Sequence, residues 1–557
     1  MIQNPILRGF RPDPAILRFR DDFYIVNSTF EWFPGLEIHH SKDLKHWRLL
    51  THALTRKSQL DLTKTAPSQG IWAPCLTYDE RENRFYLCYT LVHSLTSNFF
   101  DLDNCMVTAA SIEGPWSDPI YLNSGGFDPS FLHDADGRQW IVSMVWDFRE
   151  GYEHPGYICL QEYSRAEKRL IGERYDIYHS KELGCVEGPH LYQRNGYYYL
   201  MTAEGGTGYG HACMLSRSRD IRGPYEPSPY NPLFTSARQK YNGIEHLDYK
   251  KPFLYNPDSA LQKCGHGSLV ETQAGECYVA HICARPLIPE LRSVLGRETA
   301  LQKVDWTEDG WLKLAGGGQL AQLEVPEPNL LEVSLEQAPA RDDFDKPVLD
   351  LEWSSLRQPV DDSWASLTAR PGYLRLRGRE SLCSRNKVSL IARRIQSFHF
   401  QAETCVEFEP ENFQQMAGLV CLYDDINHYY LRIYYSDTLE SRCLGLMSAD
   451  NGLRSEHLDC RIAIPEKGRV YLRVVVHEKA MNFHYSLNGA DWQVIGPVFD
   501  ASKLSDEYCA NGQFTGAFVG ITAQDFYLRQ IYADFDYFEY LECTTTDQVT
   551  KTIYETN

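Results

Sequence analysis

Five short stretches decide the fold: Asp13-Pro14, Trp72-Ala73-Pro74, Asp128-Pro129, Glu187-Gly188-Pro189 and His266-Gly267. Each opens a short apolar strand, and successive openings begin 59, 56, 59 and 79 residues apart. A period near 58 residues is too long for a solenoid unit and fits the blades of a β-propeller, each a small antiparallel sheet around a central axis. If the strands are equivalent, the five first side chains converge at one end of the axis, as they would in an active site.

The rest of each repeat is typical of a blade. A turn and then an aromatic-rich apolar strand follow every opening, at residues 22–26, 84–88, 139–142, 197–201 and 276–280. Asp136-Gly137, Asn195-Gly196 and Ala274-Gly275 supply turn residues before the last three of these strands. Since the fourth interval is about 20 residues too long, we expect an insertion at Tyr230–Lys263, a polar segment that indicates a long loop.

The repeat stops at a connector marked by Gly316-Gly317-Gly318 and Pro326-Glu327-Pro328. Short alternating strands and Asn-Gly turns then continue for about 200 residues, a pattern typical of a β-sandwich. We therefore predict an all-β protein with a five-bladed β-propeller at residues 1–325, a linker at 326–341 and a jelly-roll β-sandwich at 342–545. The sandwich is expected to begin at Asp342–Phe344 and end at Ala533–Phe538, with these two strands paired.

Composition limits the classes of partner. The chain has 557 residues, 43% of them hydrophobic, which is enough for two sizeable cores. Its net charge of −20 disfavours nucleic acid and anionic membranes as partners. The arginine-rich N-terminus has no apolar run, so we expect no signal peptide. No apolar stretch approaches the ~18 residues of a membrane helix, and we expect a soluble protein.

The sixteen cysteines do not suggest a disulfide framework. Nine precede residue 300 and seven follow residue 380, and none forms a Cys-x-x-Cys pair that would indicate a zinc or redox site. Many lie inside apolar strands, where a thiol behaves as a small hydrophobe. We therefore expect reduced, buried thiols and a cytoplasmic protein.

Several motifs in this order resemble glycoside hydrolase family 43, most closely its two-domain β-xylosidases. They include Asn4–Pro14, Ser28–Gly35, Gly70–Pro74, Glu187–His190, Glu204–Tyr209, Gly265–Ser268, Leu295–Thr299 and Phe514–Gly520. The resemblance covers nearly the full chain and implies a five-bladed propeller joined to a β-sandwich. Two features depart from the family pattern: Arg11, where Asn is expected, and the insertion at 230–263. The insertion leaves substrate size and assembly open.

Three of the repeated openings carry the residues that glycoside hydrolysis needs. A carboxylic acid must protonate the departing oxygen, and in an inverting enzyme a carboxylate roughly 6.5–9.5 Å away activates water. Carboxylates on three blades can meet that spacing across an axis. The resemblance implies that Asp13 is the general base, Glu187 the general acid and Asp128 the residue that orients the acid and tunes its pKa. The alternative is that these residues only begin strands, but three at one period favour catalysis.

The resemblance also implies a set of supporting residues. Arg297 would bind sugar hydroxyls and contact the carboxylates, with a surface ion pair as the alternative. Thr207 would touch the second sugar, and Phe514 would close the pocket. Apolar walls for the sugars are expected from Phe30, Trp72, Phe127 and Trp146. His266 would lie under the pocket floor, where in some relatives a histidine coordinates calcium. Because one histidine is a poor metal signature, a hydrogen-bonded structural histidine is the alternative, and no cofactor is required.

These expectations give a function. We predict an exo-acting β-1,4-xylosidase that acts with inversion on xylobiose and short xylooligosaccharides in xylan degradation, as a homodimer or homotetramer. The same carboxylates would serve an α-L-arabinofuranosidase or a bifunctional enzyme. A non-catalytic carbohydrate-binding protein predicts loss of a carboxylate, yet all three are present. A protein-interaction propeller would not need five polar or aromatic residues at the axis.

Overall fold

The structure is a computed structural model that describes residues 1–95, 99–150, 156–238, 252–510 and 513–543. Contacts divide the chain into two compact units: residues 1–60, 69–285 and 297–336 form the first, and residues 61–68, 286–296 and those from Gln337 onward form the second. Two short segments within residues 1–325 thus pack with the second unit. The first unit continues to Glu336, through most of the predicted linker.

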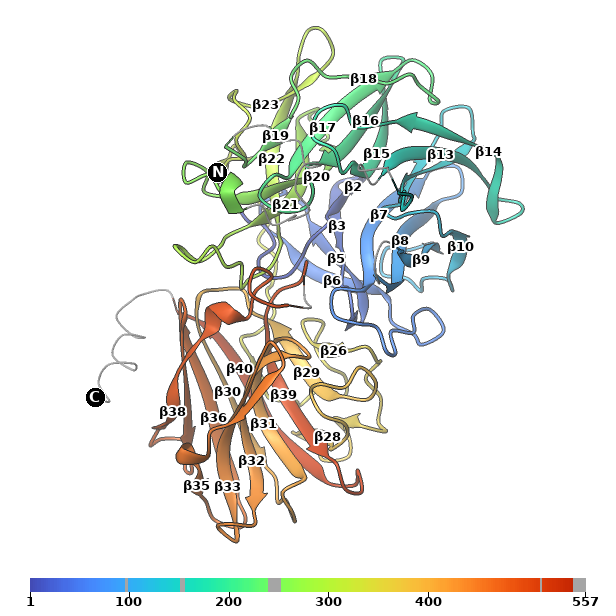
Figure 1. The fold of residues 1–557 in the computed structure, drawn as a ribbon. Helices are drawn as coiled ribbons and strands as arrows, with labels where there is room; N and C mark the ends of the chain where they lie inside the picture. Colours follow the sequence, from blue (N-terminus) through green and yellow to red (C-terminus); the bar gives the residue numbers. More distant parts are fainter. Residues whose placement is uncertain (96–98, 151–155, 239–251, 511–512, 544–557) are drawn as a thin grey trace. The chain divides into compact units, whose positions relative to one another are not determined.

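The first unit is the predicted five-bladed propeller, drawn from blue to yellow-green in Figure 1. Each blade is an antiparallel sheet. The first has β2 (Ala15–Phe19), β3 (Asp22–Asn27), β5 (Gly35–Ser41) and β6 (Arg48–Leu54). The second has β7 (Gly70–Asp79), β8 (Arg84–Ser94), β9 (Asp101–Ala109) and β10 (Ile120–Asn123). The third has β11 (Ser130–His133), β12 (Gln139–Val145), β13 (Tyr157–Ser164) and β14 (Arg169–Tyr178).

The remaining two blades follow the same order along the chain. The fourth has β15 (Glu187–Arg194), β16 (Tyr197–Glu204), β17 (Ala212–Ser218) and β18 (Glu226–Pro227), with β19 (Phe234–Thr235) also beside β17. The fifth has β20 (Gln262–Glu271), β21 (Cys277–Ala284), β22 (Glu298–Trp306) and β23 (Leu312–Leu314). Outside the blades lie β4 (Trp32–Phe33) and the pair of β1 (Ile2–Gln3) with β24 (Glu324–Val325).

The first strands of the blades form the inner ring. β2 contacts β7, β7 contacts β11, β11 contacts β15, β15 contacts β20, and β20 returns to β2. The second strands are the apolar strands that the sequence predicts, and β12 and β21 are buried along their whole length. The buried side chain of Asn4 holds the start of the chain to the fifth blade. Its Nδ2 donates to the Leu301 backbone carbonyl over 2.8 Å, and its Oδ1 accepts from the Leu301 backbone amide over 2.8 Å.

The second unit is a sandwich of two antiparallel sheets, coloured yellow to red in Figure 1. One sheet runs in the order β27 (Ala365–Ser366), β28 (Leu374–Arg377), β40 (Tyr532–Glu542), β30 (His399–Glu407), β36 (Arg469–His477), β37 (Ala480–Ser486) and β38 (Gln493–Asp500). β25 (Arg341–Asp342) pairs with β40 through Asp342 and Phe538, so the predicted pairing of first and last strands is confirmed.

The other sheet of the sandwich runs in the order β34 (Leu453–Glu456), β33 (Ser441–Asp450), β32 (Asn427–Ser436), β31 (Gln415–Asp424), β39 (Phe518–Asp525), β29 (Ser389–Arg394) and β26 (Ser354–Leu356). β35 (Ile462–Ala463) pairs with β33. Apolar residues of both sheets, such as Leu419, Leu431, Val474 and Phe535, form one continuous core. The alternating pattern in the sequence therefore corresponds to inward-facing positions.

Helical structure in the described residues is confined to three short 3-10 turns, η2 (Pro252–Leu254), η3 (Leu458–Cys460) and η4 (Ala501–Lys503). None of the helices in this part of the chain is long and apolar enough to span a membrane. All sixteen cysteines are free thiols, and twelve of them are buried, as the sequence predicts. The predicted insertion at 230–263 lies partly outside the described residues, since 239–251 are not among them.

Candidate active site

Each blade has one special backbone conformation, within or just before its inner strand. Five residues have a left-handed φ at this point: Asp13 (53°), Ala73 (37°), Asp128 (56°), Gly188 (55°) and His266 (55°). A proline or glycine follows each of them. Side chains rarely adopt this conformation, so its recurrence marks one structural position in all five blades.

The five residues that open the predicted repeats are not all at this equivalent position, so the prediction is wrong in this detail. Trp72 and Glu187 lie one residue before it, whereas Asp13, Asp128 and His266 occupy it. The strand pairing is irregular between Trp72 and Cys75 and between Glu187 and His190. An irregularity of this kind changes which side chain points toward the axis. The period alone could not show it, because a shift of one residue is smaller than the variation in blade length.

Asp13 is held as a carboxylate by its neighbours. It is buried, its Oδ1 lies 3.1 Å from a guanidinium nitrogen of Arg297, and its Oδ2 accepts from the Ser28 hydroxyl over 2.6 Å. Burial raises the pKa of Asp13, but the charges of Arg297 and His266 and the Ser28 hydrogen bond together lower it below the ordinary 3.8. Asp13 is therefore ionised at neutral pH.

Ser28 is a functional residue that the sequence reasoning missed. Its hydroxyl donates to Asp13 and also accepts from the Ala73 amide over 2.7 Å, so it links the first blade to the second. The signal lies in the motif Ser28-Thr29-Phe30, where a hydroxyl residue stands two positions before the aromatic one.

Asp128 and Glu187 have the opposite electrostatics. Burial and then the charge of Asp13 raise the pKa of Glu187 to about 7, although Arg297 lowers it. Burial and then the charges of Glu187 and Asp13 raise the pKa of Asp128 well above 3.8. Asp128 Oδ2 accepts from the Gly188 amide over 2.8 Å, directly beside Glu187. The pKa of each of these two carboxyls is therefore raised, whereas that of Asp13 is lowered.

Arg297 joins the base to the polar wall of the site. One of its nitrogens donates to Asp13 and, over 3.0 Å, to the Thr207 hydroxyl. Its guanidinium lies 5.6 Å from the centre of the Phe30 ring. Arg297 is 5% exposed, so the surface ion pair considered from the sequence is wrong. Donors held in this way suit the hydroxyls of a sugar.

Aromatic rings form a continuous wall along the carboxylates. The centres of Phe30 and Trp72 lie 5.8 Å apart, those of Trp72 and Phe127 5.7 Å, and those of Phe127 and Trp146 6.3 Å. Phe30 and Ile71 exchange backbone hydrogen bonds of 3.0 and 3.1 Å, which brings Phe30 beside Trp72. Phe100, which the sequence reasoning missed, stacks on Trp146 at 4.1 Å.

His266 lies within β20, the inner strand of the fifth blade, and is buried. A Cβ at Gly188 would lie 3.1 Å from its imidazole, so the two inner strands are close here. Burial lowers the pKa of His266 below 6.5, which keeps the ring neutral at pH 7. Among the described residues, no group of three or more His, Cys, Asp or Glu could hold a metal. A calcium ion would need most of its ligands from water, so the predicted calcium stays a prediction.

Arg11, the departure from the family pattern, lies directly behind this site. Its side chain is buried and pairs with Glu37 at 3.0 Å. Its backbone amide donates to the Arg297 carbonyl over 3.0 Å, and its carbonyl accepts from the Thr299 hydroxyl over 2.6 Å. Arg11 therefore supports the segments that carry Asp13 and Arg297. Phe514 lies in the second unit, and its predicted contact with substrate stays a prediction.

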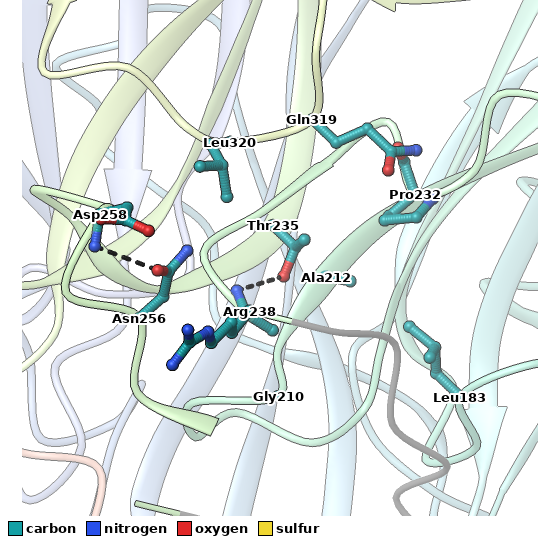
Figure 2. A pocket seen from close by; sticks show the side chains of 11 residues that line it. Leu183, Gly210, Ala212, Pro232, Thr235, Arg238, Asn256, Asp258, Gln319 and Leu320 are labelled. Carbon is teal, nitrogen blue, oxygen red and sulfur yellow. Dashed lines mark hydrogen bonds between the residues drawn. The ribbon is translucent and has the colours of Figure 1, made fainter. Parts of the chain in front are cut away.

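A separate hollow lies beside the described flanks of the 230–263 segment. Figure 2 shows this cavity of about 340 Å³, and none of the three carboxylates lines it. Thr235 and Asn256 contribute polar groups from the two flanks. It is not part of the site described above.

Comparison with known proteins places this arrangement in context. Residues 2–312 match the model of "Glycosyl hydrolases family 43", and residues 341–541 match "Beta xylosidase C-terminal Concanavalin A-like domain". A "Beta-xylosidase" of Bacillus subtilis is 44% identical over 97% of this chain and 99% of its own length. A "Xylosidase/arabinosidase 43B" of Humicola insolens is 44% identical over 97% of each chain.

A solved structure is also similar over the full chain. A crystal structure described as a xylan beta-1,4-xylosidase from Bacillus halodurans is 51% identical, with a TM-score of 0.92 over 97% of this chain and 100% of the other. The second unit is thus a concanavalin A-like sandwich, which makes the predicted jelly-roll type more specific.

The Ser28 hydrogen bond leads to a prediction. Replacing Ser28 with Ala removes a donor to the Asp13 carboxylate, so the pKa of Asp13 should rise and the acid limb of kcat/KM should move to higher pH. We expect kcat/KM for an aryl glycoside to fall roughly 10-fold at pH 6, since such a bond contributes about 1.5–3 kcal/mol. Ser28→Thr keeps the hydroxyl and should restore most of the activity. An acid limb that does not move in Ser28→Ala would contradict this role.

Proposed function

Since the chain belongs to glycosyl hydrolase family 43, we propose that it is an exo-acting β-xylosidase. It would release xylose from the non-reducing end of xylobiose and short β-1,4-xylooligosaccharides with inversion of configuration. The observation that carries this proposal is the unequal charge of the buried carboxylates, because Asp13 is held ionised while the pKa of Glu187 is raised to about 7. Inverting hydrolysis needs one base and one acid in this relation.

In the proposed reaction, each of the three carboxyl groups has one role. Glu187 gives its proton to the glycosidic oxygen as the bond from C1 to that oxygen breaks. Asp13 takes a proton from a water molecule whose oxygen forms the new bond to C1 from the opposite face. Asp128 accepts a hydrogen bond from the Gly188 amide, directly beside Glu187, and would orient the acid. The charge of Asp13 raises the pKa of Glu187 and so favours its protonated form. The products are xylose and a shortened chain, and both carboxyls return to their starting states by exchange with solvent.

The polar and aromatic walls would hold the sugar for this reaction. Arg297 and Thr207 are joined by a hydrogen bond and would take sugar hydroxyls at one side. Phe30, Trp72 and Phe127 would pack against the C–H faces of the sugars on the other. His266 would support the floor of the pocket. Action at the chain end is proposed because relatives similar over nearly their whole length are named β-xylosidases.

A second candidate activity is hydrolysis of α-L-arabinofuranosides. The relative named "Xylosidase/arabinosidase 43B" supports it, since it matches the chain as closely as the B. subtilis β-xylosidase does. The same three carboxyls would serve this reaction. We further propose action in the cytoplasm on imported oligosaccharides, which the sixteen free cysteines favour, and assembly into a homodimer or homotetramer.

The choice of substrate can be tested directly. Purified enzyme should show a higher kcat/KM for xylobiose than for an aryl α-L-arabinofuranoside, with xylose as the only product of xylobiose. Chromatography of sugars in a mixture of both substrates measures the two rates in one sample. Release of arabinose with no cleavage of xylobiose would contradict the proposal and establish the second candidate.

The role of Glu187 predicts a dependence on pH and on leaving group. Because the proton of Glu187 is required and its pKa is about 7, kcat/KM for xylobiose should fall as pH rises through about 7. Glu187→Ala should lower kcat/KM for xylobiose roughly 10²- to 10⁴-fold. For 2,4-dinitrophenyl β-xyloside, the same variant should lose far less kcat/KM, because that leaving group departs without a proton.

A matched control for this variant is Glu173→Ala, an exposed glutamate on β14 that should leave both activities unchanged. An equal loss on both substrates in Glu187→Ala would show that Glu187 is not the acid.

A further inference from the structure

Two aromatic side chains that the proposed reaction does not use stand together on the surface of the propeller. The rings of Phe99 and Phe148 lie 5.1 Å apart, and the residues are 57% and 51% exposed. Single exposed apolar residues are common, but an exposed aromatic pair that is continuous with a binding wall marks a binding surface.

The topology places this pair at the end of the propeller that carries the catalytic groups. Phe99 lies between the end of β8 and the start of β9, and Phe148 lies between the end of β12 and the start of β13. β8 and β12 run antiparallel to β7 and β11, so each ends beside the start of the inner strand of its blade. Trp72 is at the start of β7, and Asp128 directly precedes β11.

The pair adjoins the aromatic wall along the chain, since Phe99 precedes Phe100 and Phe148 lies two residues after Trp146. Phe100, next to Phe99 in the chain, stacks on Trp146 at 4.1 Å with an angle of 9° between the rings. Phe100 also lies 6.1 Å from Phe127, the residue before Asp128. Exposure increases along this path, from 6% at Phe127 to 57% at Phe99. The wall therefore leads from the buried carboxylates out to solvent.

We propose that Phe99 and Phe148 form an outer subsite that packs against the third sugar of a xylooligosaccharide. This rests on the proposed exo-acting function, in which the terminal xylose lies beside Asp13 and Arg297. The rest of the chain then leaves the site on the leaving-group side, along the wall of Phe127, Trp146 and Phe100. A pyranose has apolar C–H faces, and exposed aromatic rings offer a matching surface at low entropic cost.

The subsite makes the effect of a variant depend on substrate length. Xylobiose would fill only the two inner positions, so its hydrolysis should not need the pair. The double variant Phe99→Ala/Phe148→Ala should change kcat/KM for xylobiose less than 2-fold and lower it for xylotriose roughly 3- to 10-fold. Initial rates at low substrate concentration measure both values.

Two controls separate binding from a general effect of the substitutions. Phe413→Ala removes a phenylalanine that is 57% exposed in the second unit and should change neither rate. Phe99→Tyr/Phe148→Tyr keeps the aromatic faces and should retain the wild-type ratio of xylotriose to xylobiose. If the pair had only a structural role, the double alanine variant would lower kcat/KM for xylobiose and xylotriose by the same factor.

Each other outcome overturns the proposal. Equal losses on xylobiose and xylotriose, or no loss on either, would exclude an outer subsite. A change in molar mass by light scattering, with unchanged kinetics, would assign the pair to contact between copies of the chain. If the unaltered enzyme fails to cleave xylobiose, the proposed function fails, and the subsite fails with it.

Discussion

The salt bridge between Asp13 and Arg297 sets the charges in the candidate active site. Two buried carboxyls, Asp13 and Asp128, and the half-buried Glu187 share one region of the propeller, and desolvation raises the pKa of each of them. Only Asp13 has a guanidinium at 3.1 Å and a hydroxyl at 2.6 Å, and only its pKa is lowered. The charge therefore resides on Asp13, and its repulsion helps to keep a proton on Glu187. One ion pair thus gives the proposed base and the proposed acid different charges.

The fold supplies this asymmetry through its repeated inner strands. A left-handed residue lies within or just before each inner strand, and in the second and fourth blades Trp72 and Glu187 lie one residue before it. The ring of inner strands brings residues far apart in sequence together, as for Asp13 and Arg297. The backbone amide of Arg11 then holds the Arg297 carbonyl, and Ser28 holds Asp13 while it also bonds to Ala73 of the second blade.

Much of the fold and of the candidate site could be predicted from the sequence, because the sequence contains a repeat. The period gave five blades, and the motifs gave the family. Asp13, Arg297 and Thr207 are joined by hydrogen bonds, and Phe30, Trp72, Phe127 and Trp146 form one wall. What the sequence did not give depends on local geometry. Ser28 matters because its hydroxyl reaches a neighbouring blade, and Phe100 because it stacks on Trp146 from another loop. Residues 61–68 and 286–296 pack with the second unit, which no change of composition marks.

The most direct test of the account is proton NMR of the anomeric signals during the first minutes of xylobiose hydrolysis. If Asp13 activates water while Glu187 donates its proton, α-xylose must appear first and then mutarotate to the equilibrium mixture. Early appearance of β-xylose would require a covalent intermediate on one of the carboxylates. That result would contradict the assignment of Asp13 as a base and with it the purpose given to the Asp13–Arg297 ion pair.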